Sequence, residues 1–352
     1  MVKFLPMQPN KNHIFCDFLT CSQYHEQEHA PVFGRLSTSI DENGIGSPPF
    51  HHPKTLSGEF GSSVQISSDG HLVTFDGNPS RWNRPDNVHG LPLDEAKRVV
   101  NQILLANGLP PFHGVNLKFR QTDENRNHLA VTDGAVFSRI DMTTNVITGS
   151  PSNLHAFLQY QKTQSFPRLE QRIYGNNTYH GKDSDSRQFL IYDKGLDVKN
   201  KLLSKAEDPE YLQSILNFLH SNGVARLEMS YKRFLRKRNR RFWNLATSAN
   251  LNAQFTKDFK LMAKDIETPD YGDMPTECLK TLGLYMMGMN PKEVLSPKTY
   301  YKHKKILKSY GYDIANPNIH LLQGKVKIIT LKPCELPDWY RHADTSLLKA
   351  VN

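Results

Sequence analysis

The stretch "PEYLQSILNFLHSNGVARLEMSY", from Pro209 to Tyr231, decides the interpretation of the fold because it joins two patterns of secondary structure. Its first part predicts a helix, with Pro209 near the first turn and Gly223 at the end. Its second part, "VARLEMSY" from Val224 to Tyr231, predicts a strand. A helix that leads directly into a strand indicates a domain in which helices and sheet are mixed.

The same alternation of helices and strands runs through the first part of the chain. Apolar residues alternate around Asp69-Gly70, which predicts a hairpin over residues 62–78, and "NTYHG" and "RQFLIYDK", separated by "KDSDS", predict a second hairpin. Further elements are a strand over Ala135–Thr143 and helices over Pro92–Gly108 and Ser150–Gln164. Together these elements predict an α+β fold with a mainly antiparallel central sheet and flanking helices, in a first domain over residues 1–247.

The chain becomes helical after this domain. "TECLKTLGLYMMGMN" and "SPKTYYKHKKILKSYG", joined by "PKEVL", predict two short helices, the second capped by Ser296 and ended by Gly311. Their layout resembles a helix-turn-helix, although a purely structural helical hairpin has the same periodicity. We therefore expect a smaller, helical, helix-turn-helix-like accessory domain over residues 248–352.

Basic residues predict a polyanionic partner. Lys and Arg number 44 against 35 Asp and Glu, which gives a net charge of +9. The charge gathers in two clusters interleaved with aromatic residues, a composition that suits phosphate contact and base stacking, although either cluster alone is equally typical of a solvated helix face. The basic residues that we expect to bind DNA from these clusters are Lys232, Arg233, Arg236, Lys237, Arg238, Arg240, Arg241, Lys302, Lys304 and Lys305.

The segment "HEQEH" matches the HExxH pattern of zinc peptidases. That pattern needs a helix, on which His25 and His29 bind zinc and Glu26 acts as general base. Pro31 follows closely, and no apolar stripe supports a helix here. We therefore interpret the match as an accident of a histidine-rich loop, with a zinc peptidase kept as a rival function.

Neither a secretory signal nor a transmembrane run is evident in the sequence. The amino-terminal residues lack a long apolar stretch, and no segment reaches transmembrane length. The four cysteines form no CxxC pair, so reduced thiols in a cytosol are the expectation. These features predict a protein without a membrane partner.

Ionisable residues fall on three of the expected extended segments. Arg139 and Asp141 are two positions apart and share one face of a strand, as do Arg226 and Glu228. A structural ion-pair network is one interpretation of these pairs. The other is a site in which the carboxylates hold Mg²⁺ or Mn²⁺ and the arginines orient phosphate, with Tyr179 as a nucleophile that the cations activate.

The same segments carry a resemblance to a known family. "FSRID", "TYHGKDSDSRQFLIYDKGLD" and "RLEMSYKRFL" are similar to the gene II replication initiators of filamentous phages and, more distantly, to rolling-circle initiators of staphylococcal-type plasmids. "GNPSRWNRPDNVHG", "LSPKTYYKHKKILKSYGYDI" and "LPDWY" resemble other parts of the phage family, the last two in the region also made as the gene X protein. The match looks strongest to the initiators of cholera-toxin-type phages.

The resemblance implies origin-specific nicking and strand joining in rolling-circle replication. It makes Tyr179 the nucleophile, with Tyr192 in reserve, and it places Asp141, Glu228 and Asp17 at a Mg²⁺ or Mn²⁺ site. Lys182 stands where the plasmid pattern has serine, and we count it among the DNA-binding residues with Arg139 and Arg226. The implied partners are the double-stranded circular phage DNA, single-stranded DNA and the host helicase and polymerase, in the cytoplasm of a host bacterium.

Two further classes of function fit parts of the sequence. A non-catalytic, sequence-specific DNA-binding regulator would account for the basic clusters equally well. An RNA-binding protein would need single-strand stacking motifs that the sequence does not show. Cleavage of DNA separates the first rival from the initiator.

Overall fold

The structure is a computed structural model of the chain. It describes residues 2–5, 13–26, 30–40, 42–46, 50–114, 116–121, 128–166, 168–203, 206–262, 274–310, 312–315 and 327–342.

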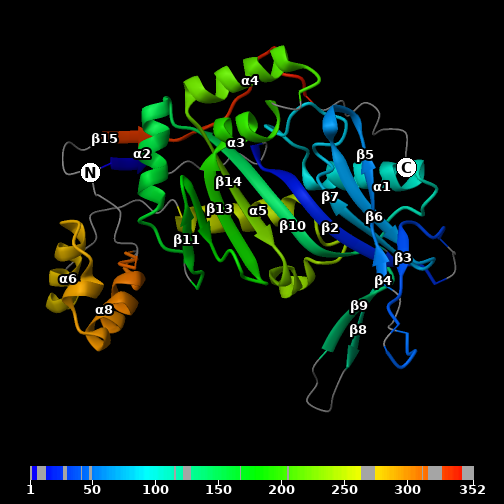
Figure 1. Cartoon of the computed structure of the whole chain (residues 1–352), viewed down its shortest axis with the longest axis horizontal. Coiled ribbons are helices and arrows are strands. Elements are labelled where there is room, and N and C mark those ends of the chain that lie inside the picture. Colours follow the sequence, from blue (N-terminus) through cyan, green and yellow to red (C-terminus); the bar gives the residue numbers. More distant parts are fainter. Residues whose placement is uncertain are drawn as a thin grey trace.

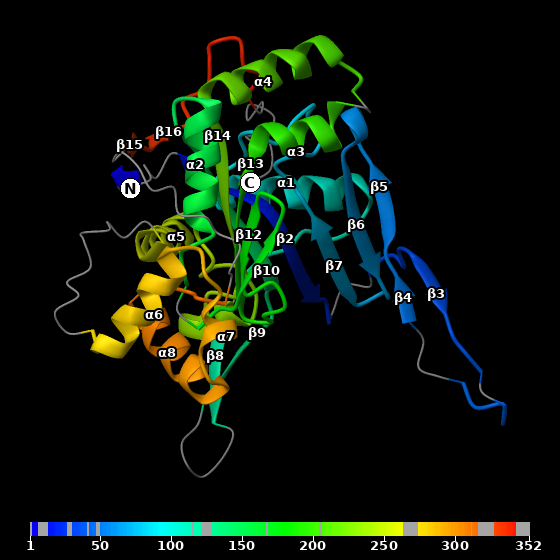
Figure 2. The ribbon, with the colours of Figure 1, turned by 60° about the vertical axis from the view of Figure 1, so that its left-hand side comes forward.

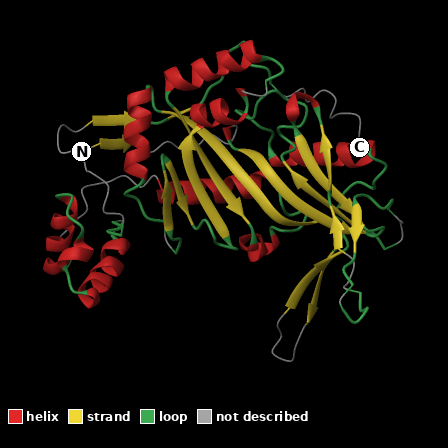
Figure 3. Ribbon diagram, in the orientation of Figure 1, coloured by secondary structure: helices red, strands yellow, loops and turns green. Residues whose placement is uncertain are grey.

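A large antiparallel sheet forms the centre of the molecule (Figures 1 and 3). Its strand order is β11-β12-β13-β14-β10-β2-β7-β6-β5, and β16 also pairs with β10, while β1 and β15 pair in parallel apart from it. The strands are β1 (Val2–Leu5), β2 (Phe15–Tyr24), β3 (Arg35–Ser37), β4 (Phe50–His52), β5 (Lys54–Ser57), β6 (Ser63–Ser68), β7 (Leu72–Gly77), β8 (Leu117–Gln121), β9 (His128–Thr132), β10 (Val136–Ile147), β11 (Gln171–Tyr174), β12 (Asn177–His180), β13 (Arg187–Asp193), β14 (Val224–Tyr231), β15 (Lys327–Thr330) and β16 (Lys332–Pro333).

Helices cover the sheet and form a group of their own near the carboxyl end. They are α1 (Leu93–Ala106), α2 (Pro151–Gln161), α3 (Lys194–Lys201), α4 (Pro209–Asn222), α5 (Ser248–Met262), α6 (Thr276–Met286), α7 (Pro291–Val294) and α8 (Pro297–Ser309), with the 3₁₀ helices η2 (Glu59–Gly61) and η4 (Arg233–Asn239). In Figure 1, α1 and α5 lie behind the sheet, and α3 and α4 lie above it. The predicted α+β fold with a mainly antiparallel sheet and a helical carboxyl-terminal region is confirmed.

The decisive stretch folds as its sequence predicts. The Asp208 side chain caps α4 by accepting a hydrogen bond from the backbone N–H of Tyr211, and Pro209 takes the first helical position. Gly223 ends the helix with a φ of 58°, and a β-carbon there would collide with the carbonyl oxygen of Ser150. The chain then turns directly into β14, so the tight junction depends on glycine.

The main core lies between the sheet and its covering helices. Leu93, Ala96 and Val100 of α1, a helix that contacts β2, are buried there, and Leu251 and Phe255 of α5 join the same core. The predicted boundary at residue 247 therefore falls just before a helix that packs on the sheet. The apolar face of α5 covers the same core as that of α1, and the division of the chain into two domains stays a prediction.

The helices after residue 274 have a separate small core. Cys278, Leu282 and Tyr285 of α6 pack against Tyr300 and Leu307 of α8. Figure 2 shows α6, α7 and α8 as a group of their own. Ser296 caps α8 as expected, whereas Gly311 lies outside the described residues, and α8 ends at Ser309. The helix-turn-helix interpretation of this group stays a prediction.

Across the described residues, every helix is too short or too polar to cross a membrane. The four cysteines are buried free thiols.

Candidate active site

The register of the central strands places the predicted acidic residues on one face of the sheet. Glu228 of β14 pairs with Thr143 of β10, two positions from Asp141, and Asp141 itself pairs with Ser230. Residues directly opposite in an antiparallel sheet share a face, as do residues two apart in one strand. Asp141 and Glu228 therefore project to the same side, as the sequence predicts.

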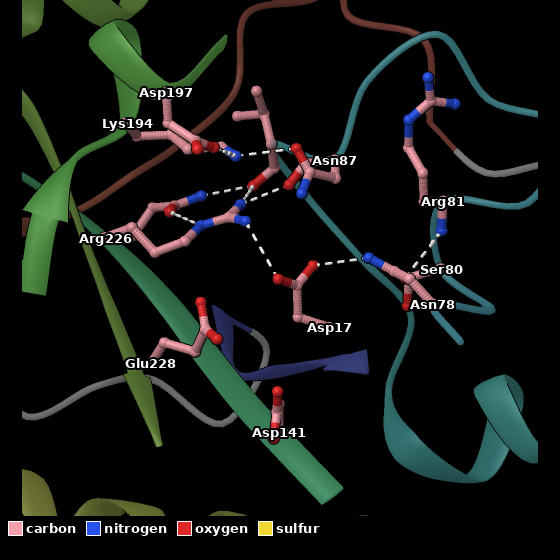
Figure 4. A network of polar contacts seen from close by, with 12 residues as sticks. Asp17, Asn78, Ser80, Arg81, Asn87, Asp141, Lys194, Asp197, Arg226 and Glu228 are labelled. Carbon is pink, nitrogen blue, oxygen red and sulfur yellow. Dashed lines mark hydrogen bonds and ion pairs between the residues drawn. The ribbon is translucent and has the colours of Figure 1, made fainter. Parts of the chain in front are cut away.

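Asp17 reaches this face through a β-bulge. In the pairing of β2 with β10, Phe18 lies opposite Asp141 and Cys16 lies opposite Met142, so Asp17 is the extra residue between them. A bulge turns a side chain out of the regular alternation. Cys16 points into the core, and Asp17 turns to the side on which Asp141 and Glu228 lie (Figure 4).

A cavity of about 410 Å³ lies over these residues. Its lining includes Asp17, Tyr179, Tyr192, Asp197, Lys201 and Glu228. The cavity thus brings together the predicted nucleophile, the reserve tyrosine and two of the three predicted carboxylates. Asp141 is buried beside it rather than part of its lining.

Arg226 holds the inner wall of the site. Its Nε donates to Asn145 Oδ1 at 2.9 Å, its Nη2 donates to the carbonyl oxygen of Val88 at 2.9 Å, and its Nη1 lies 3.5 Å from Asp17 Oδ2. The side chain has no exposed surface. The expectation that Arg226 contacts DNA is therefore wrong for this structure, because the segment after β7 covers the guanidinium and leaves it to neutralise Asp17.

Arg139 neutralises the third carboxylate in a similar way. Its Nε donates to Asp141 Oδ1 at 2.9 Å and its Nη2 donates to Oδ2 at 2.5 Å, while the guanidinium stacks on the ring of Phe18. Asp141 is 1% exposed, and its burial raises the pKa of its carboxyl above the ordinary value although Arg139 opposes the shift. Arg139 thus pairs with Asp141 and leaves only part of its side chain exposed.

Glu228 is a carboxyl group whose charged form is disfavoured in the folded protein. Burial raises its pKa well above the ordinary 4.5, and the nearby charges of Asp17 and Asp141 raise it further. Its Oε2 accepts a hydrogen bond from the Tyr192 hydroxyl at 3.4 Å. A divalent ion would relieve this repulsion between like charges.

The two candidate tyrosines differ in their surroundings. Tyr192 is 8% exposed, and burial raises the pKa of its phenol well above 10. Tyr179 is only half-buried and faces the cavity, with Lys182 Nζ 5.4 Å from its ring centroid. Exposure and the neighbouring cation favour Tyr179 over Tyr192 as the candidate nucleophile.

Sequence reasoning missed Tyr174, which lies beside Tyr179. The two ring centroids are 5.6 Å apart in an edge-to-face contact, and Lys182 Nζ lies 4.0 Å from the Tyr174 centroid. Hydrogen bonds from Lys182 and Arg172 lower the pKa of the exposed Tyr174 phenol. The β11–β12 register places Tyr174 on the same face as Tyr179, a relation that depends on strand pairing.

A second buried cation that the sequence did not reveal supports the site from α3. Lys194 Nζ donates to Asn87 Oδ1 and to Asp197 Oδ2, each at 2.8 Å (Figure 4). Burial, with the nearby charge of Arg226, lowers the pKa of Lys194 to about 8. Asn78 donates to Asp17 Oδ1 at 2.9 Å and so fixes the other oxygen of that carboxylate.

The predicted DNA-binding cations are unequally exposed. Arg236 and Lys237 of η4 are exposed, as are Lys302 and Lys305 of α8 and Lys182 just after β12. The remaining basic residues of the two clusters either contact other parts of the chain or are partly buried, and one has a side chain outside the described part. Arg233 pairs with Asp185, Lys232 donates to the carbonyl oxygen of Ser184, Arg240 donates to Gln254, Arg241 stacks on Phe242, Lys304 is half-buried, and the side chain of Arg238 lies outside the described part.

Comparison with known proteins identifies the family. A family model for the N-terminal part of the replication-associated gene II protein matches residues 33–256, which is more than half of the chain. The chain belongs to this family. The matched range contains Asp141, Tyr179 and Glu228, and Asp17 precedes it.

Two curated members of the family match over most of their length. The replication-associated gene II protein of Escherichia phage If1 is 29% identical over 316 residues, which cover 79% of this chain and 97% of that protein. The replication-associated gene II protein of Enterobacteria phage I2-2 is 22% identical over 339 residues, which cover 89% of this chain and 93% of that protein. The resemblance to filamentous-phage replication initiators is confirmed.

The "HEQEH" segment does not form a zinc-binding helix where it is described. His25 and Glu26 follow the end of β2 in irregular conformation, and residues 27–29, including His29, lie outside the described part. The interpretation of the motif as an accident agrees with this conformation.

The carboxylates of the site suit a magnesium ion better than zinc. No group of three or more His, Cys, Asp and Glu side chains within the described ranges is already arranged as a metal site. Mg²⁺, however, uses one or two carboxylates and completes its shell with water and substrate phosphate. Asp17 and Glu228 line one cavity, so they are the two carboxylates that would be available to such an ion.

Proposed function

We propose that this member of the gene II protein family starts rolling-circle replication by nicking one strand of the origin with Tyr179. One observation carries the proposal: Tyr179, Asp17 and Glu228 line the same cavity, although they come from three separate strands. Exposed cations on η4 and α8 support DNA as the substrate.

The chemistry that suits this cavity is transfer of a phosphoryl group to a phenol. The Tyr179 oxygen attacks the phosphorus of a phosphodiester, and the bond from phosphorus to the 3′ oxygen breaks. The tyrosine is then joined to the 5′ phosphate of the downstream fragment. The phenol proton passes to water, and the departing 3′ oxygen takes a proton from water. The resulting 3′-OH can be extended, and the reverse reaction joins the strands.

A divalent ion belongs to the proposal as an expected cofactor. Asp17 and Glu228 would hold it, and when bound it would supply positive charge to the phosphoryl oxygens in the transition state. Arg226 keeps Asp17 in position through its contact at 3.5 Å, and Arg139 keeps Asp141 paired. Tyr192 orients Glu228 by its hydrogen bond.

The partners follow from the reaction. Duplex origin DNA is the substrate, the displaced product is single-stranded DNA, and a host helicase and polymerase would separate and extend the strands in the bacterial cytoplasm. Arg236, Lys237, Lys302 and Lys305 would contact backbone phosphates.

The proposal is tested with a supercoiled plasmid that carries the origin of the phage encoding this protein. With Mg²⁺, the wild-type protein should convert it to open circles, and Tyr179→Phe should lower the rate by at least about 10³-fold because the attacking oxygen is gone. Tyr192→Phe removes the hydrogen bond to Glu228 but not the proposed attacking oxygen, so it should lower the rate far less than Tyr179→Phe does. Nicking by Tyr179→Phe at the wild-type rate would refute the assignment of the nucleophile.

A non-catalytic DNA-binding regulator is the competing function. The observation in its favour is that arginines already pair with two of the three carboxylates. It predicts retention of origin DNA in a gel without any cut strand, whichever divalent ion is added. That result with the wild-type protein would replace the proposed function.

A further inference from the structure

The cavity extends beyond the carboxylates to a second wall that the proposed chemistry does not use. Its lining there consists of Gly61, Ser62, Ser63 and Arg81. In the sheet order, Tyr179 lies on β12, Glu228 on β14 and Asp17 on β2, and this wall adjoins β6 farther along. The cavity therefore runs across the sheet with the carboxylates between its two ends.

The far wall is a tightly tied loop with a strained residue. Phe60 has a φ of 53°, a left-handed conformation that costs free energy for an aromatic residue. Arg81 Nη2 donates to the carbonyl oxygen of Phe60 at 2.7 Å. The backbone N–H of Glu59 donates to Asn83 Oδ1 at 2.9 Å, and the N–H of Asn83 donates to Ser62 Oγ at 3.0 Å.

The Arg81 guanidinium has donor capacity left over. Its Nη1 is buried and has no hydrogen-bond partner in the described part of the chain, and the described ranges contain no carboxylate in ion-pair contact with it. Burial lowers the pKa of Arg81, with the charge of Arg84 adding to the shift and Asp86 opposing it. A buried guanidinium N–H without an acceptor is costly, and a phosphate oxygen is an acceptor that suits it.

A hydrogen bond of the Arg81 backbone fixes this residue near Asp17, while its side chain extends elsewhere. Its N–H donates to Asn78 Oδ1 at 3.0 Å, and Asn78 in turn fixes Asp17. In Figure 4 the guanidinium points away from Asp17. The guanidinium is therefore set apart from the carboxylates over which the scissile phosphate would lie.

We propose that Arg81 binds a backbone phosphate of the cleaved DNA strand, one or a few nucleotides away from the scissile phosphate. This inference rests on the proposed function, because it assumes that the strand lies in the cavity over the carboxylates. Arg81 acts as a substrate-binding residue that sets the position of the strand. The contact is to the backbone, so it is independent of base sequence.

The test is binding of fluorescein-labelled oligothymidylate to a protein that cannot cut. In a Tyr179→Phe background, Arg81→Met should weaken binding by about tenfold or more, the effect of losing one charge-assisted hydrogen bond. The slope of log K against log salt should fall by about 0.7, the value for one phosphate contact on single-stranded DNA. Arg81→Lys keeps the charge and should restore the slope but only part of the affinity.

Arg98 provides the matched control, since it is an exposed arginine on α1, behind the sheet. Arg98→Met should leave affinity and slope unchanged. If Arg81→Met and Arg81→Lys both match Arg98→Met, the inference is wrong, and Arg81 serves only to tie the Phe60 loop, which a lowered melting temperature would register. If Arg81 proves necessary for binding but the wild-type protein never nicks origin plasmid, the proposed function fails while the binding site stands.

Discussion

At the scale of single residues, the site is a balance of charges in a partly buried space. Asp17, Asp141 and Glu228 lie on one face, and Arg226 and Arg139 each neutralise one of the first two. Glu228 has neither an arginine nor a lysine within ion-pair distance among the described residues, and burial, together with the nearby charges of Asp17 and Asp141, raises its pKa. Glu228, which pairs with no cation among the described residues, lines the cavity together with Tyr179.

The raised pKa of Glu228 has a consequence for stability. Between the ordinary pKa of 4.5 and the higher folded value, the folded protein keeps a proton that the unfolded chain has lost. Stability therefore falls as the pH rises through this range, by at most about 1.4 kcal/mol per pH unit. Glu228→Gln cannot lose a proton and removes this fall.

The measurement is urea unfolding of both proteins at several pH values from about 5 upward. His89 and His180 have pKa values lowered to about 4 by burial and add their own pH dependence, but they are common to both proteins and cancel in the difference. Added Mg²⁺ should reduce the fall in the wild-type protein only. Parallel stability profiles for the two proteins would show that Glu228 titrates normally.

The sequence predicted part of the arrangement of residues in the site. The alternation of side chains along a strand predicted that Asp141 and Glu228 share one face, and the register confirms it. This alternation could not reveal the bulge that turns Asp17 to the same side, because a bulge is a property of the paired strand. It also could not show that Arg226 is buried, since the covering carbonyl oxygens come from Asn87 and Val88, far away in the sequence.

At the scale of elements, a buried polar network fastens α5 to the sheet. Asp258 of α5 accepts from Arg187 Nη1 at 2.9 Å, from the Tyr231 hydroxyl at 2.9 Å and from Gln254 Nε2 at 3.0 Å. Arg187 and Tyr231 sit opposite each other on β13 and β14, so one carboxylate ties the helix to two strands. The network lies next to η4, whose Phe234 ring contacts the Arg187 guanidinium and whose exposed cations we expect to contact DNA.

Asp258→Ala should therefore be strongly destabilising. It leaves the largely buried Arg187 and the buried Tyr231 hydroxyl without their acceptor, which costs about 3–5 kcal/mol for a buried ion pair. The control is Asp183→Ala, which removes an exposed pair with Arg172 and should cost less than about 1 kcal/mol. Chemical unfolding measures both, and equal losses in the two variants would contradict the role given to the network.

Local sequence signals predicted the elements that begin or end at a proline or glycine. They did not identify α5 as a helix that packs on the sheet. The α4–β14 junction follows from Pro209 and Gly223, and the hairpin over β6 and β7 follows from Asp69-Gly70. The strand expected over 135–143 continues to Ile147 as β10, because β14 and β2 pair with most of its length. No local signal separates α5 from the helices that follow it.

At the scale of the whole molecule, the carboxyl-terminal segment closes on the segment that holds the site. The Tyr340 hydroxyl donates to Asp86 Oδ1 at 2.7 Å and accepts from Arg84 Nη2 at 3.0 Å and from the N–H of His89 at 3.1 Å. The segment from Asn78 to Leu91 also supplies the contacts to Asp17, Arg226 and Lys194. Tyr340 thus braces the segment that supplies Arg81 and Asn87 to the cavity lining.

Tyr340→Phe should loosen that wall without removing a catalytic group. The loss of three hydrogen bonds leaves the buried Asp86 oxygen short of a donor and should lower the free energy of unfolding by about 1–3 kcal/mol. Tyr301→Phe, at an exposed position of α8, should change it by less than about 0.5 kcal/mol. Because the same wall positions Asp17, we also expect Tyr340→Phe to need more Mg²⁺ for half-maximal nicking, and an unchanged requirement would show that the wall does not act on the site.

The central claim is that Tyr179 attacks the DNA backbone in a cavity shared with Asp17 and Glu228. The most direct measurement is peptide mass spectrometry of the covalent complex formed when the protein and Mg²⁺ act on a single-stranded oligonucleotide that contains the origin nick site. We predict a nucleotide attached through a 5′ phosphate to Tyr179 and to no other tyrosine. Attachment at Tyr174 or Tyr192, or cleavage that leaves no protein–DNA bond, would contradict the account.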